Sequence, residues 1–179
     1  MQRKEKIMDR QKCEPSHVKK CSIRPLKPEE YPLLEDFLYE AIYLAEGTAL
    51  PPKEIIRQPE LAVYIENFGQ PDDFCLAAEA NGQIIGVVWT RILAGEIKGY
   101  GNLDDRTPEF AISVKREFRR QGIGRKLMQE MITLLKKQGY EKASLSVNKE
   151  NDAFRMYREL DFQVIKERKE DWLMVLELR

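Results

Sequence analysis

The sequence Arg119-Arg-Gln-Gly-Ile-Gly-Arg125 joins two segments that differ in hydrophobic periodicity. Residues 109–114, before it, are mostly apolar and predict a strand. Residues 122–138, after it, place apolar side chains four apart from Ile123 to Leu135, which predicts an amphipathic helix. A strand, a tight glycine turn and a long helix therefore follow one another here, as they do in α/β domains.

This glycine turn predicts an anion-binding site. The first N–H groups of a helix lack backbone partners, and the helix dipole adds partial positive charge there. Gly122 and Gly124 allow a phosphate to approach the backbone closely. The spacing matches neither the Walker loop nor G-x-G-x-x-G. Two other interpretations stay open: a turn with a solvated basic face, and a nucleic-acid-binding patch. The arginines that add counter-charge are Arg119, Arg120 and Arg125.

The rest of the chain also consists of predicted strands and helices separated by turn residues. Asn81-Gly82 is typical of a type I′ hairpin turn, Gly139 of a helix C-cap and Asn151 of an N-cap. The long loop 94–108 contains three glycines and is expected to be functional. We expect further strands at 22–25, 74–80, 83–93, 142–147, 163–168 and 171–178, and helices at 28–45, 59–67 and 151–160. This order predicts a mixed α/β sheet.

Length and charge indicate one domain with a tail. The chain has 179 residues, 42% of them hydrophobic and 34% charged, which is typical of a single globular domain. Residues 1–20 contain seven basic and three acidic side chains without hydrophobic periodicity. We therefore expect a basic disordered tail of charge +4 at 1–20 and a domain of charge −4 at 21–179.

The residue inventory excludes several kinds of site. The single histidine, His17, lies in the tail, so neither a histidine-based triad nor a histidine-rich zinc site is expected. No C-x-x-C spacing occurs, and Cys75 lies in an apolar segment typical of a core. The chain shows no secretory signal and no apolar run long enough to cross a bilayer. We expect a cytoplasmic protein without a bound metal or a membrane partner.

At residues 119–125 the chain resembles the GNAT superfamily of acyl-CoA-dependent N-acetyltransferases. The family signature Arg/Gln-x-x-Gly-x-Gly/Ala is matched by Arg119, Gly122 and Gly124. A later family pattern, N-x-A-x-x-x-Y-x-x-x-G-F, matches at every position but one: Asn151, Ala153, Tyr157 and Phe162 fit, and Asp161 replaces the glycine. The resemblance covers residues 22–178 and implies a mixed, mostly antiparallel sheet of about seven strands with about four helices.

The resemblance also implies a co-substrate, acetyl-CoA, and a place for it. The pyrophosphate would lie on backbone N–H groups of the signature turn, and the pantetheine arm would pair with the preceding strand, which splays from the next. Asn151 and the helix that it begins would flank the coenzyme. The implied binding residues are Ile112, Ser113, Val114, Arg119, Arg120, Gln121, Gly122, Ile123, Gly124, Arg125, Asn151 and Ala153.

For the chemistry, the resemblance implies direct attack of an amine on the thioester. Tyr157 matches the family's general acid; the competing interpretation is a core tyrosine. Without a usable histidine, the base must be a carboxylate, a tyrosine or a water chain. We assign Glu109 as the hypothetical base, acting through water. A surface glutamate at the strand edge is the alternative there, and Asp104 and Asp105 are competing candidates.

The acceptor is expected between the first two helices, the loop 94–108 and the last hairpin. Acidic side chains slightly outnumber basic ones in this region, which suits a cationic amine on a small molecule, a peptide or a protein. Two other functions stay open: a non-catalytic acyl-CoA sensor, and a nucleic-acid-binding domain that uses the tail. No nucleic acid is expected for the main hypothesis, and a homodimer is one option. The acidic residues are Glu46, Glu96, Asp104 and Asp105.

Overall fold

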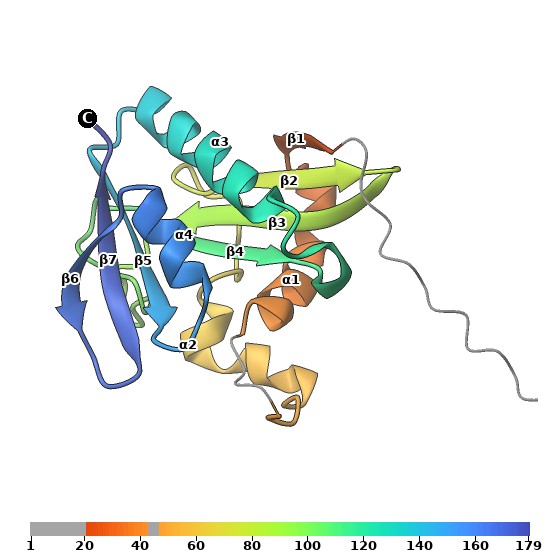
Figure 1. Ribbon diagram of the computed structural model, residues 1–179, viewed down its shortest axis with the longest axis horizontal. Helices are drawn as coiled ribbons and strands as arrows, with labels where there is room; N and C mark the ends of the chain where they lie inside the picture. Colours follow the sequence, from red (N-terminus) through yellow and green to blue (C-terminus); the bar gives the residue numbers. More distant parts are fainter. Residues whose placement is uncertain (1–20, 43–46) are drawn as a thin grey trace, which may run out of the picture.

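One sheet organises the chain in the computed structural model, which describes residues 21–42 and 47–179. Within these ranges, seven strands lie in the order β1-β2-β3-β4-β5-β7-β6 (Figure 1). All neighbouring strands are antiparallel except β4 and β5. The mixed, mostly antiparallel sheet is therefore confirmed, whereas the tail at 1–20 lies outside the described residues.

The predicted strands are all present, and their bounds differ from the prediction by two residues at most. Asn81 and Gly82 have φ values of 53° and 75°, as a type I′ turn requires, and they join β2 to β3. The strands are β1 Ser22–Pro25, β2 Phe74–Ala80, β3 Gln83–Arg91, β4 Glu109–Val114, β5 Lys142–Asn148, β6 Gln163–Glu167 and β7 Asp171–Glu177.

Two helices after β4 are also close to the prediction. Helix α3 covers Ile123–Lys137 and is followed by Gly139, whose φ of 86° fits a left-handed cap. Helix α4 covers Ala153–Glu159; Asp152, directly before it, makes no side-chain capping bond, whereas Asn151 Oδ1 accepts from Ala153 N. Asp161 has a φ of 68°, the left-handed conformation for which the family uses glycine.

The predicted helix at 28–45 is wrong in kind and extent. A 3₁₀ segment, η1 Pro28–Leu33, comes first and contains Pro32, which donates no backbone hydrogen bond, and α1 then covers Leu34–Ala41. Residues 43–46, where the helix was expected to end, lie outside the described residues. Two further 3₁₀ segments were not predicted, η2 Lys53–Arg57 and η3 Arg116–Phe118.

The predicted helix at 59–67 is also too long. Helix α2 covers only Pro59–Ala62, and turns follow it. Side chains of β3 bind carbonyl groups of these turns: Trp89 Nε1 donates to Tyr64 O (3.0 Å), and Arg91 Nη1 donates to Val63 O and to Glu66 O (both 2.8 Å).

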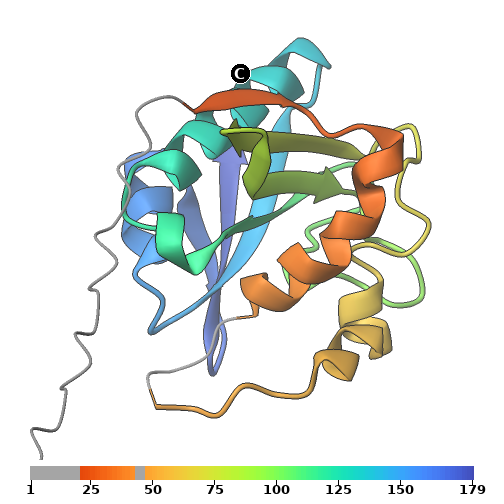
Figure 2. The same ribbon diagram turned by 90° about the vertical axis from the view of Figure 1, so that its right-hand side faces the viewer.

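The helices lie on two faces of the sheet (Figures 1 and 2). Side chains of α1 pack with Trp89 in one core, and Cys75 is buried there as predicted. Side chains of α3 and α4 pack on the opposite face with Phe162 and Met174. Each described helix is too short or too polar to cross a lipid bilayer. The sheet thus separates two hydrophobic layers. The candidate site lies in the middle of the sheet, where two neighbouring strands diverge.

Candidate active site

Strands β4 and β5 separate in the middle of the sheet. They pair at one register position only, Glu109 with Ser144, where Ser144 N donates to Pro108 O over 3.0 Å. Beyond this pair the strands diverge, as Figure 1 shows, while β5 stays paired with β7 along its length. The backbones of β4 and β5 therefore splay apart, and one side of this wedge is the edge of β4.

The edge of β4 presents free backbone groups to the wedge. Lys115 N donates to Ile85 O of β3 (2.9 Å), and the bonding partner of successive residues alternates in an antiparallel pair. Ser113 consequently directs its backbone groups toward β3, whereas Ile112 and Val114 direct theirs into the wedge. Two of the three β4 residues expected to bind a pantetheine arm thus have the required orientation.

The glycine turn lies beside this edge. Gly122 has a left-handed φ of 79°, and its carbonyl accepts from Lys126 N (3.1 Å) at the start of α3. Within the described residues, the N–H groups of 123–125 donate to no backbone carbonyl, as in the first turn of any helix. A Cβ added to Gly124 would lie 3.8 Å from Ile112 Cδ1, so the helix begins against β4. This N-terminus can hold an anion next to the wedge.

The arginines of the turn are all paired with carboxylates near α1 and α4. Arg119 Nε also donates to Val114 O (2.7 Å), which ties the turn to the β4 edge, and Gln121 Nε2 donates to Glu117 O (3.3 Å). The paired side chains are more than a third exposed, so the ion pairs are screened by water and a phosphate can compete for them. The pairs are Arg119 with Glu40, Arg120 with Asp152 and Arg125 with Glu159.

Glu109 is buried at the start of β4, with 3% of its surface exposed. Its Oε1 accepts hydrogen bonds from the Tyr64 hydroxyl and from Gly101 N (2.7 Å). Its Oε2 is buried and has no hydrogen-bond partner among the described residues. A Cβ built on Gly99 would lie 2.0 Å from Oε2, so only glycine allows the carboxyl to lie here. The alternative of an exposed strand-edge glutamate is therefore wrong.

This environment changes the proton affinity of Glu109. Burial raises the pKa of Glu109 to about 7, although the hydrogen bonds from Tyr64 and Gly101 and the charge of Arg168 act in the opposite direction. A carboxyl that titrates near neutrality is suited to general base work. Perturbed pKa values of this kind are concentrated at functional sites.

The competing carboxylates have different surroundings. Asp104 Oδ1 accepts from Arg106 N (2.9 Å) and Thr107 N (2.8 Å), and these backbone bonds lower the pKa of Asp104. The Asp105 side chain is 85% exposed. Asp104 therefore shapes its own loop and Asp105 faces solvent, whereas Glu109 is held inside the fold.

Tyr157 lies on α4 and is 7% exposed. Its ring packs edge-to-face on Phe162, with centroids 6.0 Å apart, and burial raises the pKa of Tyr157 to about 12. No hydrogen bond to its hydroxyl occurs within the described part of the chain. At the start of the same helix, Ala153 N donates to Asn151 Oδ1 (2.9 Å), so these two expected coenzyme-flanking residues stabilise the helix end.

The elements expected around the acceptor meet beside Glu109. From the turn between β6 and β7, Arg168 Nη1 donates to Tyr100 O (2.6 Å) of the loop 94–108. Tyr100 N in turn donates to the hydroxyl of Tyr64 (2.7 Å), a residue that follows α2 in the chain. The loop, the second helical region and the last hairpin are thus joined by hydrogen bonds, whereas Glu46 lies outside the described residues.

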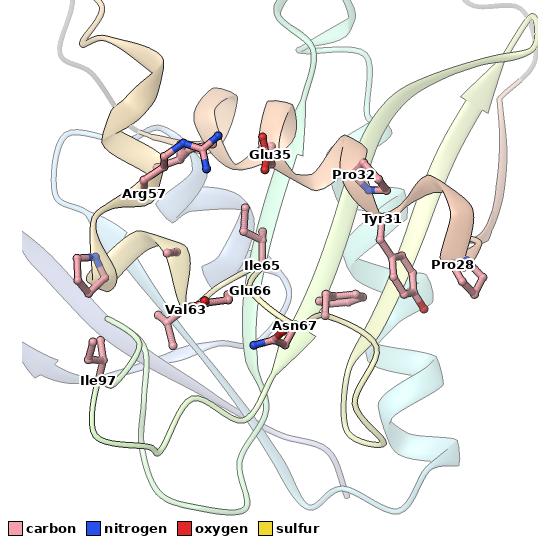
Figure 3. A pocket seen from close by; sticks show the side chains of 14 residues that line it. Pro28, Tyr31, Pro32, Glu35, Arg57, Val63, Ile65, Glu66, Asn67 and Ile97 are labelled. Atoms are coloured by element: carbon pink, nitrogen blue, oxygen red, sulfur yellow. The ribbon is translucent and has the colours of Figure 1, made fainter.

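A cavity of about 750 Å³ lies on the other side of the segment that carries Tyr64. It is bordered by η1, α1, η2 and α2, and Ile97 of the loop closes one end (Figure 3). Val63 and Ile65 line it, but Tyr64 between them bonds Glu109. The cavity therefore lies near the expected acceptor region, but Glu109 does not line it.

Sequence patterns did not single out Tyr64. It lies 45 residues before Glu109 and belongs to no motif, so only the fold brings the two together. The glycines of the loop 94–108 were the available signal, because they indicate a close backbone approach. That approach is made by Gly99 and Gly101 around the Glu109 carboxyl.

A wedge between parallel strands beside an anion-binding helix N-terminus is the arrangement that the family resemblance implied for an acyl-CoA-dependent acyltransferase. A family model described as the acetyltransferase (GNAT) family matches residues 36–162, well over half of the sequence. The chain belongs to this family of N-acetyltransferases, EC 2.3.1.-, which confirms the resemblance seen in the sequence. No curated protein matched the chain.

Solved structures share the fold at low sequence identity. The ribosomal-protein-S18-alanine N-acetyltransferase from Escherichia coli is 18% identical, with 89% of this chain and 94% of that chain covered and a TM-score of 0.61. PaiA N-acetyltransferase from Thermoplasma acidophilum, in complex with coenzyme A, is 22% identical, with 88% of this chain and 99% of that chain covered and a TM-score of 0.64. A putative acetyltransferase from Salmonella typhimurium, with its cofactor acetyl-CoA, is 19% identical, with 89% of this chain and 95% of that chain covered and a TM-score of 0.66.

Proposed function

We propose that this protein transfers the acetyl group of acetyl-CoA to a primary amine. One observation carries the proposal: the free edge of β4 runs from an anion-binding helix N-terminus to the buried carboxyl of Glu109. Residues 109–114 span roughly 17 Å at about 3.3 Å per residue, so one strand edge links the two ends of the site. Solved neighbours contain coenzyme A or acetyl-CoA.

The residues present fit the coenzyme. The N–H groups of 123–125 and the left-handed Gly122 offer donors to a pyrophosphate, and Arg120 and Arg125 add positive charge. The backbone carbonyl of Ile112 is free to accept from an extended amide-containing arm, and its N–H stays available for the thioester carbonyl. Val114 offers its N–H in the same direction, while Arg119 occupies its carbonyl.

The chain supplies the proton transfers of the reaction. The amine nitrogen attacks the thioester carbonyl carbon, a C–N bond forms and the C–S bond breaks. Glu109 accepts the proton that the amine loses, through water, and the Tyr157 hydroxyl donates a proton to the leaving thiolate. The N–H of Ile112 stabilises the negative charge on the carbonyl oxygen. One proton is accepted and one donated, so the sum is amide plus free thiol.

The glycine turn gives a prediction about coenzyme binding. Gly122→Ala places a side chain at a φ of 79°, which costs about 1 kcal/mol and shifts the turn, so we expect about fivefold weaker CoA binding. Gly139→Ala is the matched control, because it places a side chain at a similar φ of 86°, with no atom within 4 Å of the added Cβ, at the opposite end of α3. Titration calorimetry with CoA measures the effect. Equal Kd values for the two variants contradict the proposed cradle.

The proposed reaction is tested by thiol release. Incubation of the full chain with acetyl-CoA and a panel of diamines, amino sugars, amino acids and peptide N-termini should release free CoA with at least one amine. An acetylated amine of the expected mass confirms the transfer. CoA binding without thiol release across the panel would instead favour the non-catalytic sensor.

A further inference from the structure

Tyr64 has a contact to the proposed base that no sequence motif indicates. It follows α2, is 7% exposed, and its hydroxyl donates to Glu109 Oε1. The same hydroxyl accepts from Tyr100 N over 2.7 Å. The phenol therefore both donates and accepts, and these two bonds fix its orientation.

The rest of Tyr64 is equally well held. Trp89 Nε1 donates to Tyr64 O (3.0 Å), so the central strand β3 fixes the backbone at this position. The ring of Tyr64 stacks on that of Tyr100, with centroids 6.4 Å apart and an interplanar angle of 15°. Tyr64 thus reaches the carboxyl from a rigid support.

We propose that Tyr64 is a positioning residue that holds Oε1 of Glu109, so that Oε2 accepts, through water, the proton that the amine loses. Oε1 already accepts two hydrogen bonds, from Tyr64 and from Gly101 N, whereas Oε2 has no partner within the described residues. A carboxylate with donors on one oxygen keeps its free lone pairs on the other. This inference rests on the proposed function.

Gly99 fits this division of roles. A Cβ at this position would lie 2.0 Å from Oε2 and 3.0 Å from Oε1, so any side chain would occupy the place of the proton-accepting oxygen. Because residue 99 is glycine, it places only backbone atoms next to Oε2. The loop therefore closes tightly around the carboxyl without binding Oε2.

Several ionisable groups surround the Glu109 carboxyl. Tyr64 faces it from the segment after α2, and Tyr100 lies next to Tyr64 in the loop 94–108. Arg168 acts on it from the β6–β7 turn. Arg91 is the register partner of Glu109 on β3, but its guanidinium is bonded to Asp73 (2.9 Å). The Tyr64 bond lowers the pKa of Glu109, so its loss should raise that pKa.

Tyr64→Phe in the full-length protein tests the proposal. The acidic limb of kcat/KM against pH should move upward by about one to two pH units, the effect expected for a lost hydrogen bond to a charged group. At pH 6 the variant should therefore be about tenfold slower or more, and at high pH it should approach the wild type. The carboxyl ¹³C NMR signal of Glu109, assigned by its absence in Glu109→Gln, should titrate with the same shift.

Tyr140→Phe is the matched control, because its hydroxyl also bonds a carboxylate, that of Asp72, away from the wedge. In Tyr140→Phe, neither the acidic limb of kcat/KM nor the titration of the Glu109 carboxyl NMR signal should move. If Tyr64→Phe is poorly folded, 3,5-difluorotyrosine at position 64 provides a stronger donor, and both pKa readouts should move downward.

The two readouts separate the possible failures. If neither the limb nor the NMR titration moves in Tyr64→Phe, Tyr64 does not position Glu109 and the proposal is overturned. If the NMR pKa rises while the limb stays, Glu109 is not the base and the positioning role is also overturned. If the wild type releases no thiol with any amine, the proposed function has failed, which the NMR titration alone does not report.

Discussion

Glu109→Gln is expected to lower kcat/KM by about 10²- to 10⁴-fold, the usual contribution of a general base. It should also abolish the rise of kcat/KM near pH 7, since burial raises the pKa of Glu109 to about that value. The glutamine oxygen can still accept from Tyr64 and from Gly101 N, so the loop should keep its conformation. A pH profile of kcat/KM for the acetylation of the best amine is the measurement.

Glu177→Gln is the control for this variant, because Glu177 pairs with Lys142 at the end of β7 and is 61% exposed. Its pH profile should match that of the wild type. An unchanged acidic limb in Glu109→Gln would remove Glu109 as the base. Loss of that limb in Asp105→Asn instead would transfer the role to Asp105.

The same carboxyl makes folding stability depend on pH. Below the ordinary value of 4.5, Glu109 is protonated in both the folded and unfolded chains, so burial of its charge costs nothing. Between 4.5 and about 7 the unfolded chain releases the proton first, and stability falls as the pH rises. Above this window the wild type should have lost on the order of 3 kcal/mol relative to Glu109→Gln, measured by urea unfolding.

Tyr157→Phe is expected to lower kcat by about 10- to 10³-fold at saturating substrates, because the leaving thiolate loses its proton donor. The hydroxyl has no hydrogen bond within the described residues, and burial raises its pKa to about 12. Folding stability and the Kd of CoA should therefore stay close to the wild-type values. Steady-state kinetics with calorimetric CoA titration checks both.

An acetyl thioester of a more acidic thiol sharpens this experiment. Its thiolate needs less help from an acid, so the defect of Tyr157→Phe should shrink with that donor. Tyr140→Phe, remote from the wedge, should show full activity with both donors. An unchanged kcat in Tyr157→Phe with acetyl-CoA would leave Tyr157 as a core residue only.

Local patterns were sufficient for the strands and for the long helix α3. Alternation and apolar runs placed β2 and β4 at their observed bounds, and the spacing of apolar residues placed α3. The helices at 28–45 and 59–67 were wrong because local signals cannot show what competes for backbone groups. Pro32, which donates no backbone hydrogen bond, interrupts the first helical segment, and side chains of β3 bind carbonyl groups of the turns after α2.

By itself, the sequence determined the family, the order of the strands along the chain and the glycine turn at the start of α3. These features depend on residues close together in the chain, where spacing and conformational preference are visible. Only the tertiary structure decided the state of Glu109. Its burial, its Tyr64 partner 45 residues away and the glycines around its carboxyl arise from chain segments that meet only in the fold. Proton affinity depends on those surroundings, so the sequence could name Glu109 as a candidate base but could not separate this role from that of an exposed strand-edge glutamate.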